Sequence, residues 1–147
     1  MYVLENSLQD FDLFYILKSN DYLKRKGKSM DVGAVLIKLK TNTQAEVEAW
    51  QQEIEKRKAE AIQTLQAEGV KVESWFQLEL NGEHYLLAYT RAKDIAQAQQ
   101  VAKNSSFEVD KYHQQFKQHW EQVIPTRLLI DLENNDEKET GYTSEQV

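Results

Sequence analysis

Hydrophobic and polar residues alternate with two different periods along the chain, and this pattern predicts the first elements. Residues 33–40 combine β-branched side chains with alternation at their end, which predicts a strand. Over residues 44–68 apolar side chains recur on one stripe at the helical period, which predicts a long helix. Thr43 and Glu46 have the spacing of a capping box, and Gly69 is the residue type that ends helices.

Two further strand-like runs, 70–80 and 83–91, are joined by Asn81 and Gly82. Both linking residues tolerate positive φ, so the pair is a strong signal for a tight hairpin. A loop of two residues sets the register and divides the side chains between two faces. One face then holds the pairs Phe76–Leu87, Leu78–Tyr85 and Ser74–Tyr89, and the other holds Trp75, Gln77, His84, Leu86 and Ala88.

A second helical region follows the hairpin. Residues 92–103 are rich in Ala and Gln and predict one helix, which the polar residues at 104–106 interrupt. Residues 108–122 carry an apolar stripe and predict a further helix. Pro125 then opens a predicted last strand over 127–133, since proline is tolerated at a strand's first residue or on an edge strand. The order strand–helix–strand–strand–helix–strand predicts an α+β fold. It is the ferredoxin-like βαββαβ antiparallel sheet, with its second helix region broken in two.

The pattern divides the 147-residue chain into three parts. Residues 1–31 form an N-terminal extension with a short helix and a basic linker, and 32–133 form the ferredoxin-like domain. Residues 134–147 form an acidic tail that we expect to be disordered. The formal net charge of −6 is concentrated near the C-terminus, because residues 131–147 carry one basic and six acidic groups. The domain itself is therefore close to neutral.

Charge and composition exclude several classes of protein. A nearly neutral domain lacks the basic stripe of a nucleic-acid-binding protein. No apolar run approaches the roughly 20 residues that span a bilayer, and the N-terminus lacks the charge order of a secretory signal. The chain has no Cys, which excludes disulfides and fits a cytoplasmic protein. His84, His113 and His119 lack the spacing of metal ligands, so we expect no metal and no cofactor.

Apolar side chains on both faces of the predicted hairpin indicate a second cover for the sheet. A sheet covered on one side only alternates cleanly between apolar and polar residues. Helices in this topology cover one face, so something else must cover the other. The simplest cover is a second copy of the same sheet, and we therefore expect a homodimer.

Asp110 and His113 are the candidate catalytic residues. They are three positions apart on a predicted helix, so their side chains can meet. A carboxylate can hold an imidazole in one tautomer and support its charge, which is a common way to make a general base. The alternative is that His113 flanks the apolar stripe and caps the core with a hydrogen-bonded ring.

Five residues are candidates for binding a small ligand. Arg57 and Arg91 carry the cations best suited to an anionic group. Trp75, Tyr89 and Trp120 are the aromatic residues that could line a pocket. Aromatic residues at strand and helix periods are more often part of a core or an interface, so that alternative stays open.

Several segments of the chain are similar to a known family. They are VGAVLIKLK at 32–40, VESWFQLELNGEHYLLAYTRAKD at 72–94, DKYHQQF at 110–116 and RLLIDLE at 127–133. Together they resemble an uncharacterised bacterial domain-of-unknown-function family with a ferredoxin-like fold, within the dimeric α+β barrel superfamily. The resemblance implies a homodimer whose sheets face each other around a barrel. It implies no particular reaction, because that superfamily includes cofactor-free monooxygenases, isomerases, haem-degrading enzymes and proteins without known activity.

Two hypotheses about function follow. In the first, this is a protein of unknown function that forms a homodimeric α+β barrel and binds a small ligand or has a structural role. In the second, it is a cofactor-free enzyme, similar to a monooxygenase or an isomerase, that acts on a small aromatic or acidic metabolite. His113 would then be the general base. We rank the first hypothesis higher because the sequence contains no convincing catalytic constellation.

Overall fold

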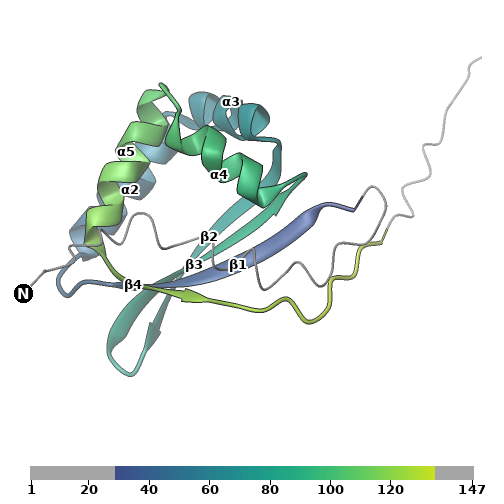
Figure 1. The fold of residues 1–147 in the computed structure, drawn as a ribbon. Helices are drawn as coiled ribbons and strands as arrows, with labels where there is room; N and C mark the ends of the chain where they lie inside the picture. The colour runs from purple at the N-terminus through teal and green to yellow at the C-terminus, as the bar shows by residue number, and fades with distance from the viewer. Residues whose placement is uncertain (1–28, 135–147) are drawn as a thin grey trace, which may run out of the picture.

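The computed structural model describes residues 29–134 as a mixed α+β fold (Figure 1). The expected N-terminal helix, the basic linker at 24–28 and the acidic tail beyond residue 134 lie outside the described residues. The elements are β1 Asp31–Leu39, α2 Gln44–Lys56, α3 Lys58–Glu68, β2 Val70–Leu80, β3 Glu83–Ala92, α4 Ile95–Lys103, α5 Glu108–Phe116, the 3₁₀ helix η2 Lys117–His119, and β4 Trp120–Pro125.

The four strands form one open antiparallel sheet in the order β2-β3-β1-β4, with the helices over one face (Figure 1). The predicted hairpin register is confirmed, because Phe76 pairs with Leu87 and Leu78 with Tyr85. The turn also has the expected backbone, with φ of 52° at Asn81 and 78° at Gly82. Side chains of β2 and β3 are therefore divided between the two faces as the sequence indicated.

The last strand lies earlier in the chain than predicted. The helix expected to reach residue 122 ends at Phe116, and the strand expected over 127–133 is absent from the described part of the chain. Instead Trp120–Pro125 pairs with β1, with Val123 opposite Ile37. Proline has no N–H to donate, so Pro125 ends the strand where we expected it to open one. Strand β4 still occupies an edge of the sheet, as predicted.

The first helical region is broken, which the sequence pattern did not predict. The backbone leaves the helical conformation at Arg57, with φ −101° and ψ 24°, and α3 starts at the next residue. The break in the second region, between Lys103 and Glu108, was expected. Gly69 ends α3 in the left-handed conformation, with φ 72°, as predicted.

The predicted capping box does not form. Thr43 precedes α2, but its hydroxyl donates to the carbonyl of Lys40 at 2.8 Å and does not accept from the helix. The Oε2 atom of Glu46 is buried without a hydrogen-bond partner. Two reciprocal bonds are therefore missing, although the helix starts at the expected place.

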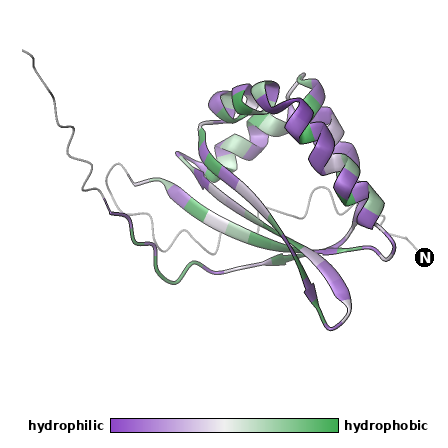
Figure 2. Cartoon of the chain, turned by 180° about the vertical axis from the view of Figure 1, so that it is seen from behind, coloured by the Kyte–Doolittle hydropathy of each residue, from purple (hydrophilic) through white to green (hydrophobic). Residues whose placement is uncertain are grey.

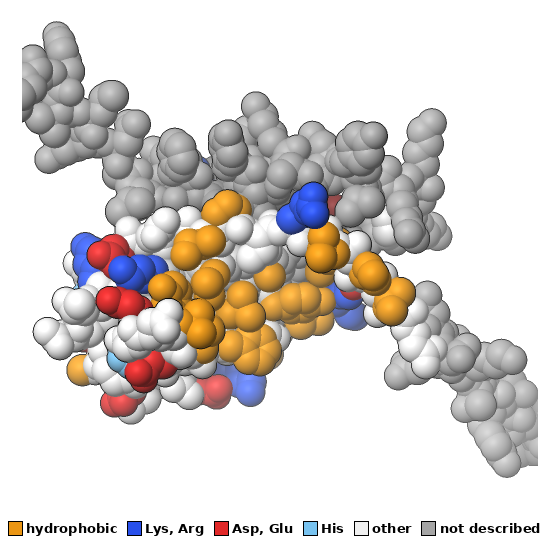
Figure 3. Space-filling view, turned by 90° about the horizontal axis from the view of Figure 1, so that it is seen from below, with side chains coloured by type: hydrophobic (Ala, Val, Ile, Leu, Met, Phe, Trp, Pro, Cys, Tyr) orange, Lys and Arg blue, Asp and Glu red, His pale blue; other side chains and the backbone are white. Residues whose placement is uncertain are grey.

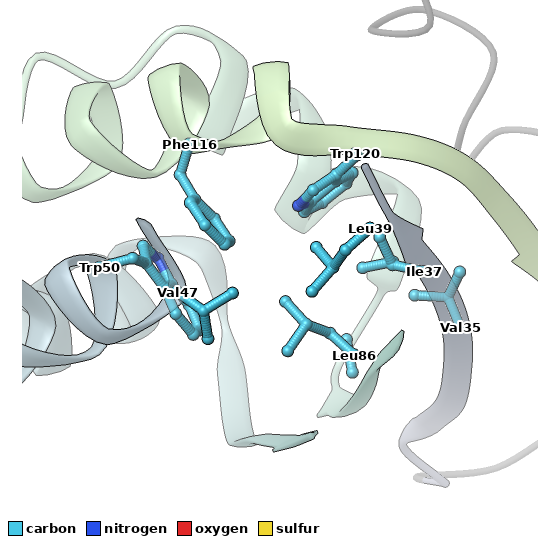
Figure 4. Close-up of a cluster of buried hydrophobic side chains, with 9 residues drawn as sticks. Val35, Ile37, Leu39, Val47, Trp50, Leu86, Phe116 and Trp120 are labelled. Carbon is cyan, nitrogen blue, oxygen red and sulfur yellow. The ribbon is translucent and has the colours of Figure 1, made fainter. Parts of the chain in front are cut away.

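The helices and the sheet pack together through two separate clusters of apolar residues. The larger lies at the β4 end of the sheet and consists of Val35, Ile37, Leu39, Val47, Trp50, Leu86, Ala88, Phe116 and Trp120 (Figure 4). The smaller joins α3 and α4 to the sheet through Val70, Ala92, Ile95, Ala98 and Leu65. Figure 2 shows hydrophilic residues over much of the outer surface of the helices. The core thus consists of two separate apolar clusters and not of one continuous layer.

We expect Leu86→Ala to lower the free energy of unfolding by about 2–5 kcal/mol, because the leucine side chain is 1% exposed and its loss leaves a void. Chemical denaturation measures the change. The matched control is Leu132→Ala, where the side chain is 88% exposed and the loss should stay below about 1 kcal/mol. Equal losses in the two variants would contradict the packing described above.

Candidate functional site

A cavity of about 500 Å³ lies between the helices and the sheet. All four strands and all four α-helices contribute to its walls. Helix α4, with the sequence IAQAQQVAK, faces the cavity with small side chains such as Ala98 and Ala102. Ala88 and Gly33 line it from the sheet. Such small groups cannot fill the distance between a helix and a sheet, so the space follows from the composition of these elements. Its volume is typical of small-molecule sites.

A second hollow of about 400 Å³ adjoins this cavity at the α4–α5 link. The two share Thr64, Glu68, Gln100 and Asp110 among their lining residues. Glu68 and Asp110 therefore lie where the inner cavity meets the more open hollow. This arrangement places two carboxylates on the route between the cavity and solvent.

Aromatic rings form the wall of the cavity at the end near β4. Trp50 stacks on Phe116, with ring centroids 4.8 Å apart, and meets Trp75 edge-on at 5.2 Å. The imidazole of His113 lies 5.3 Å from Trp75 and 6.1 Å from Trp120. These rings come from α2, β2, α5 and β4, so their contacts fix the helices to the sheet and form the wall together.

His113 is a neutral acceptor in this wall. Its Nδ1 accepts a hydrogen bond from Nε1 of Trp50 at 3.2 Å, which leaves the ring proton on Nε2. Burial, and after it the positive charge of Lys117, lowers the pKa of His113 to about 3. This geometry fits the alternative in which His113 caps the core with a hydrogen-bonded, neutral ring. Within residues 29–134 no hydrogen bond joins Asp110 to this ring.

Three of the carboxyl groups that line the cavity act on one another. Burial raises the pKa of Glu68 to about 8, and the negative charges of Asp110 and Glu73 add to the shift. Glu73 lies on an edge strand and is an exposed residue, but its carboxylate accepts from Nε1 of Trp75 at 2.7 Å. Desolvation of the carboxyl group by the protein around it raises the pKa of Glu73, and the hydrogen bond from Trp75 offsets part of the rise. The site thus holds clustered carboxyl groups beside an aromatic wall.

Two buried polar atoms at the cavity have no hydrogen-bond partner within the described part of the chain. They are the Oδ2 atom of Asp110 and the Nε1 atom of Trp120. Figure 4 shows the nitrogen-bearing side of the Trp120 ring turned toward Phe116 and Trp50. Buried polar atoms are nearly always paired, so each of these atoms is expected to meet a water molecule or a ligand group.

The structure brings four of the seven predicted site residues together. Asp110, His113, Trp75 and Trp120 all line the cavity. Arg57 lies at the helix break, where it forms ion pairs with two glutamates of its own helical region, Glu53 and Glu60.

The other two predicted residues lie on the opposite face of the sheet. The guanidinium of Arg91 donates to the hydroxyl of Tyr89 at 3.1 Å and pairs with Asp131 at 2.7 Å. Both side chains therefore point away from the helices and the cavity, since residues 89 and 91 alternate with the cavity-lining Ala88 and Thr90.

Trp50, Glu68 and Glu73 line the cavity and take part in its contacts, but the sequence did not indicate them as site residues. Trp50 belongs to the apolar stripe of the first helix and was assigned to the core. For Glu73 a signal did exist, because it alternates with Trp75 and so shares the face that the helices cover. An acidic residue on that face is unusual. Glu68 carried no such signal, since it stands among the polar residues at a helix end.

The described residues give no indication of a metal site or of a membrane span. No group of three His, Cys, Asp or Glu residues between positions 29 and 134 is arranged to hold a metal ion. None of the helices in that range is long and apolar enough to cross a bilayer.

Fold and site together define the class of protein as an α+β domain with a four-stranded antiparallel sheet and a cavity beneath its helices. Residues 30–137 match a family of unknown function, DUF6176, and since this is more than half of the chain, the protein belongs to that family. The expected likeness to an uncharacterised family is thereby confirmed. No curated protein and no solved structure matches the chain.

We expect His113 to make stability sensitive to acid. Its pKa is about 3 in the folded state and near 6.5 when unfolded, so the unfolded chain binds the extra proton between those values. Stability is fully present above pH 6.5 and falls as the pH drops toward 3, by up to about 1.4 kcal/mol per pH unit. Denaturation at several pH values should show a shallower fall for His113→Gln, which keeps an acceptor for Trp50.

The control for this experiment is His84→Gln, which changes an exposed histidine at the hairpin. Its curve of stability against pH should run parallel to that of the unchanged protein. If the His113→Gln curve also runs parallel, the imidazole is not held neutral by the fold.

Proposed function

We propose that this protein binds a small molecule in the cavity between its helices and its sheet. The observation that carries the proposal is the unpaired donor of Trp120 and the unpaired acceptor of Asp110 at one cavity of about 500 Å³. A ligand with complementary groups would satisfy both atoms and fill the space that the small side chains leave. The proposal assigns binding, and no reaction, to the site.

The alternative, a cofactor-free enzyme with His113 as its base, receives less support from the geometry. The lone pair that a base needs is already engaged, since Nδ1 accepts from Trp50. The pKa of about 3 makes this ring a poor proton acceptor near neutral pH. Asp110 remains a candidate site residue, as a binding group whose Oδ2 atom is free to accept.

We expect a variant with a filled cavity to lose ligand binding. Tyrosol, a neutral phenol with a hydroxyethyl chain, serves as the probe, and calorimetry measures its affinity. Ala61→Phe places a ring in the cavity from α3 and should lower the affinity for tyrosol at least about tenfold. Ala59→Phe is the matched control, because Ala59 is exposed on the same helix and does not line the cavity. An equal affinity in the two variants would place the probe elsewhere.

We also propose that the sheet order corresponds to the ferredoxin-like topology and that two copies pair as in the dimeric α+β barrel superfamily. The order β2-β3-β1-β4, with each crossover made by helices on one face, supports the topology. The face away from the helices supports the dimer. Hydrophobic side chains gather there (Figure 3), and Phe76 and Leu80 are 55% and 48% exposed. A monomer seldom leaves a large contiguous apolar patch in water.

We expect Phe76→Arg to convert a homodimer into a monomer, because a buried unpaired charge is costly at an interface. Light scattering at micromolar concentration gives the mass directly. Ala59→Arg, on the helical side of the molecule, is the control and should remain dimeric. A monomer mass for the unchanged protein would refute the dimer and leave the ligand site unaffected.

A further inference from the structure

We propose that the ligand of this cavity is an organic cation, an amine with an aromatic or aliphatic body and an oxygen acceptor. This inference rests on the proposed function and deepens it. The ammonium group would lie among Glu68, Glu73 and Asp110, and the body would lie along the aromatic wall. The oxygen would accept from Trp120.

The placement of the acidic side chains carries the first step of the argument. Glu68, Glu73 and Asp110 come from α3, β2 and α5, so three separate elements bring carboxylates to one cavity. The neighbouring charges that act on Glu68 are those of the other two carboxylates. Keeping these carboxyl groups ionised costs free energy in the empty protein, because like charges repel in surroundings that solvate them poorly. A bound ammonium group would remove that cost.

The unpaired buried atoms are a second, independent observation that points to a ligand. Oδ2 of Asp110 is buried and accepts no hydrogen bond within residues 29–134. An ammonium group has three N–H donors and could supply that bond. The side chain of Trp120 is more than nine-tenths buried, and its Nε1 has no acceptor. The carboxylate of Asp110 suits a cationic group, and the N–H of Trp120 suits an oxygen acceptor. A ligand that carries both groups on one molecule would pair with both residues.

Three lysines also line the cavity. Lys58 and Lys103 line it from α3 and α4 and are exposed residues. Lys117 lies at the aromatic end, with Nζ 5.3 Å from the centre of the Trp120 ring. Its charge acts on His113 and on Glu73. Glu55 adds a further carboxylate to the lining, from α2.

Three probes with the same phenol body and different charge test the proposal. Tyramine is a cation, tyrosol is neutral and phloretate is an anion, and each carries a phenol oxygen. Calorimetry on the full chain at neutral pH should show tyramine binding at least about tenfold more tightly than tyrosol, with phloretate weakest. Equal affinities for tyramine and tyrosol would overturn the cation while leaving the proposed function intact. No binding of any probe would overturn both.

Charge-removing variants locate the ammonium group. Asp110→Asn and Glu73→Gln should each lower the ratio of tyramine affinity to tyrosol affinity about tenfold. Glu79→Gln is the matched control, since Glu79 lies on the same strand as Glu73, is exposed and does not line the cavity. Circular dichroism establishes that each variant is folded. A loss in Glu79→Gln equal to that in Glu73→Gln would show that only net charge matters, which overturns the site.

Proton release gives a second readout that does not depend on affinity. Because the pKa of Glu68 is about 8 in the empty protein, this carboxyl is mostly protonated at pH 7. A cation bound beside it favours the charged form, so binding should release protons to the buffer. Calorimetry in two buffers with different ionisation enthalpies counts them. Glu68→Gln should abolish the release, and a wild-type titration without proton release would remove Glu68 from the site.

Discussion

The packing of Trp50 is the contact on which the rest of the structure depends. Its ring stacks on Phe116 and meets Trp75 edge-on, while its N–H donates to His113. One side chain of α2 is thereby fixed to α5 and to the edge strand β2. Each contact uses a different part of the indole, so the ring has few alternative positions. The same contacts help to bury His113 and build the wall of the cavity.

The cavity exists because only the ends of the helical layer carry large apolar side chains. At the β4 end tryptophan and phenylalanine fill the distance to the sheet, as Figure 4 shows. At the other end a small cluster around Ile95 makes the contact. Between them α4 offers mainly alanine and glutamine. The helical layer is interrupted at Arg57 and at 104–107. Each half of the layer can therefore pack against the sheet through its own apolar cluster. A continuous core of large residues would have left no room for a ligand.

The sequence predicted those elements whose signals are local. Asn81-Gly82 specified the hairpin and its register because only a two-residue turn with positive φ fits those residues. The last strand was misplaced because Trp120 and Val123 suit an amphipathic helix and a buried strand equally well, and pairing with β1 decided between them. The site was only half predicted for the same reason. Asp110 and His113 share a helix, whereas Glu68, Glu73 and Trp50 meet them only through the tertiary fold.

The central claim is that the space between helices and sheet is a ligand site. A crystal structure of the protein grown with tyramine tests it most directly. We expect density for the phenol ring against Trp75, with the amine nitrogen within about 3 Å of a carboxylate oxygen of Asp110 or Glu73. A cavity closed by the protein's own side chains, or tyramine bound only on the face away from the helices, would contradict it.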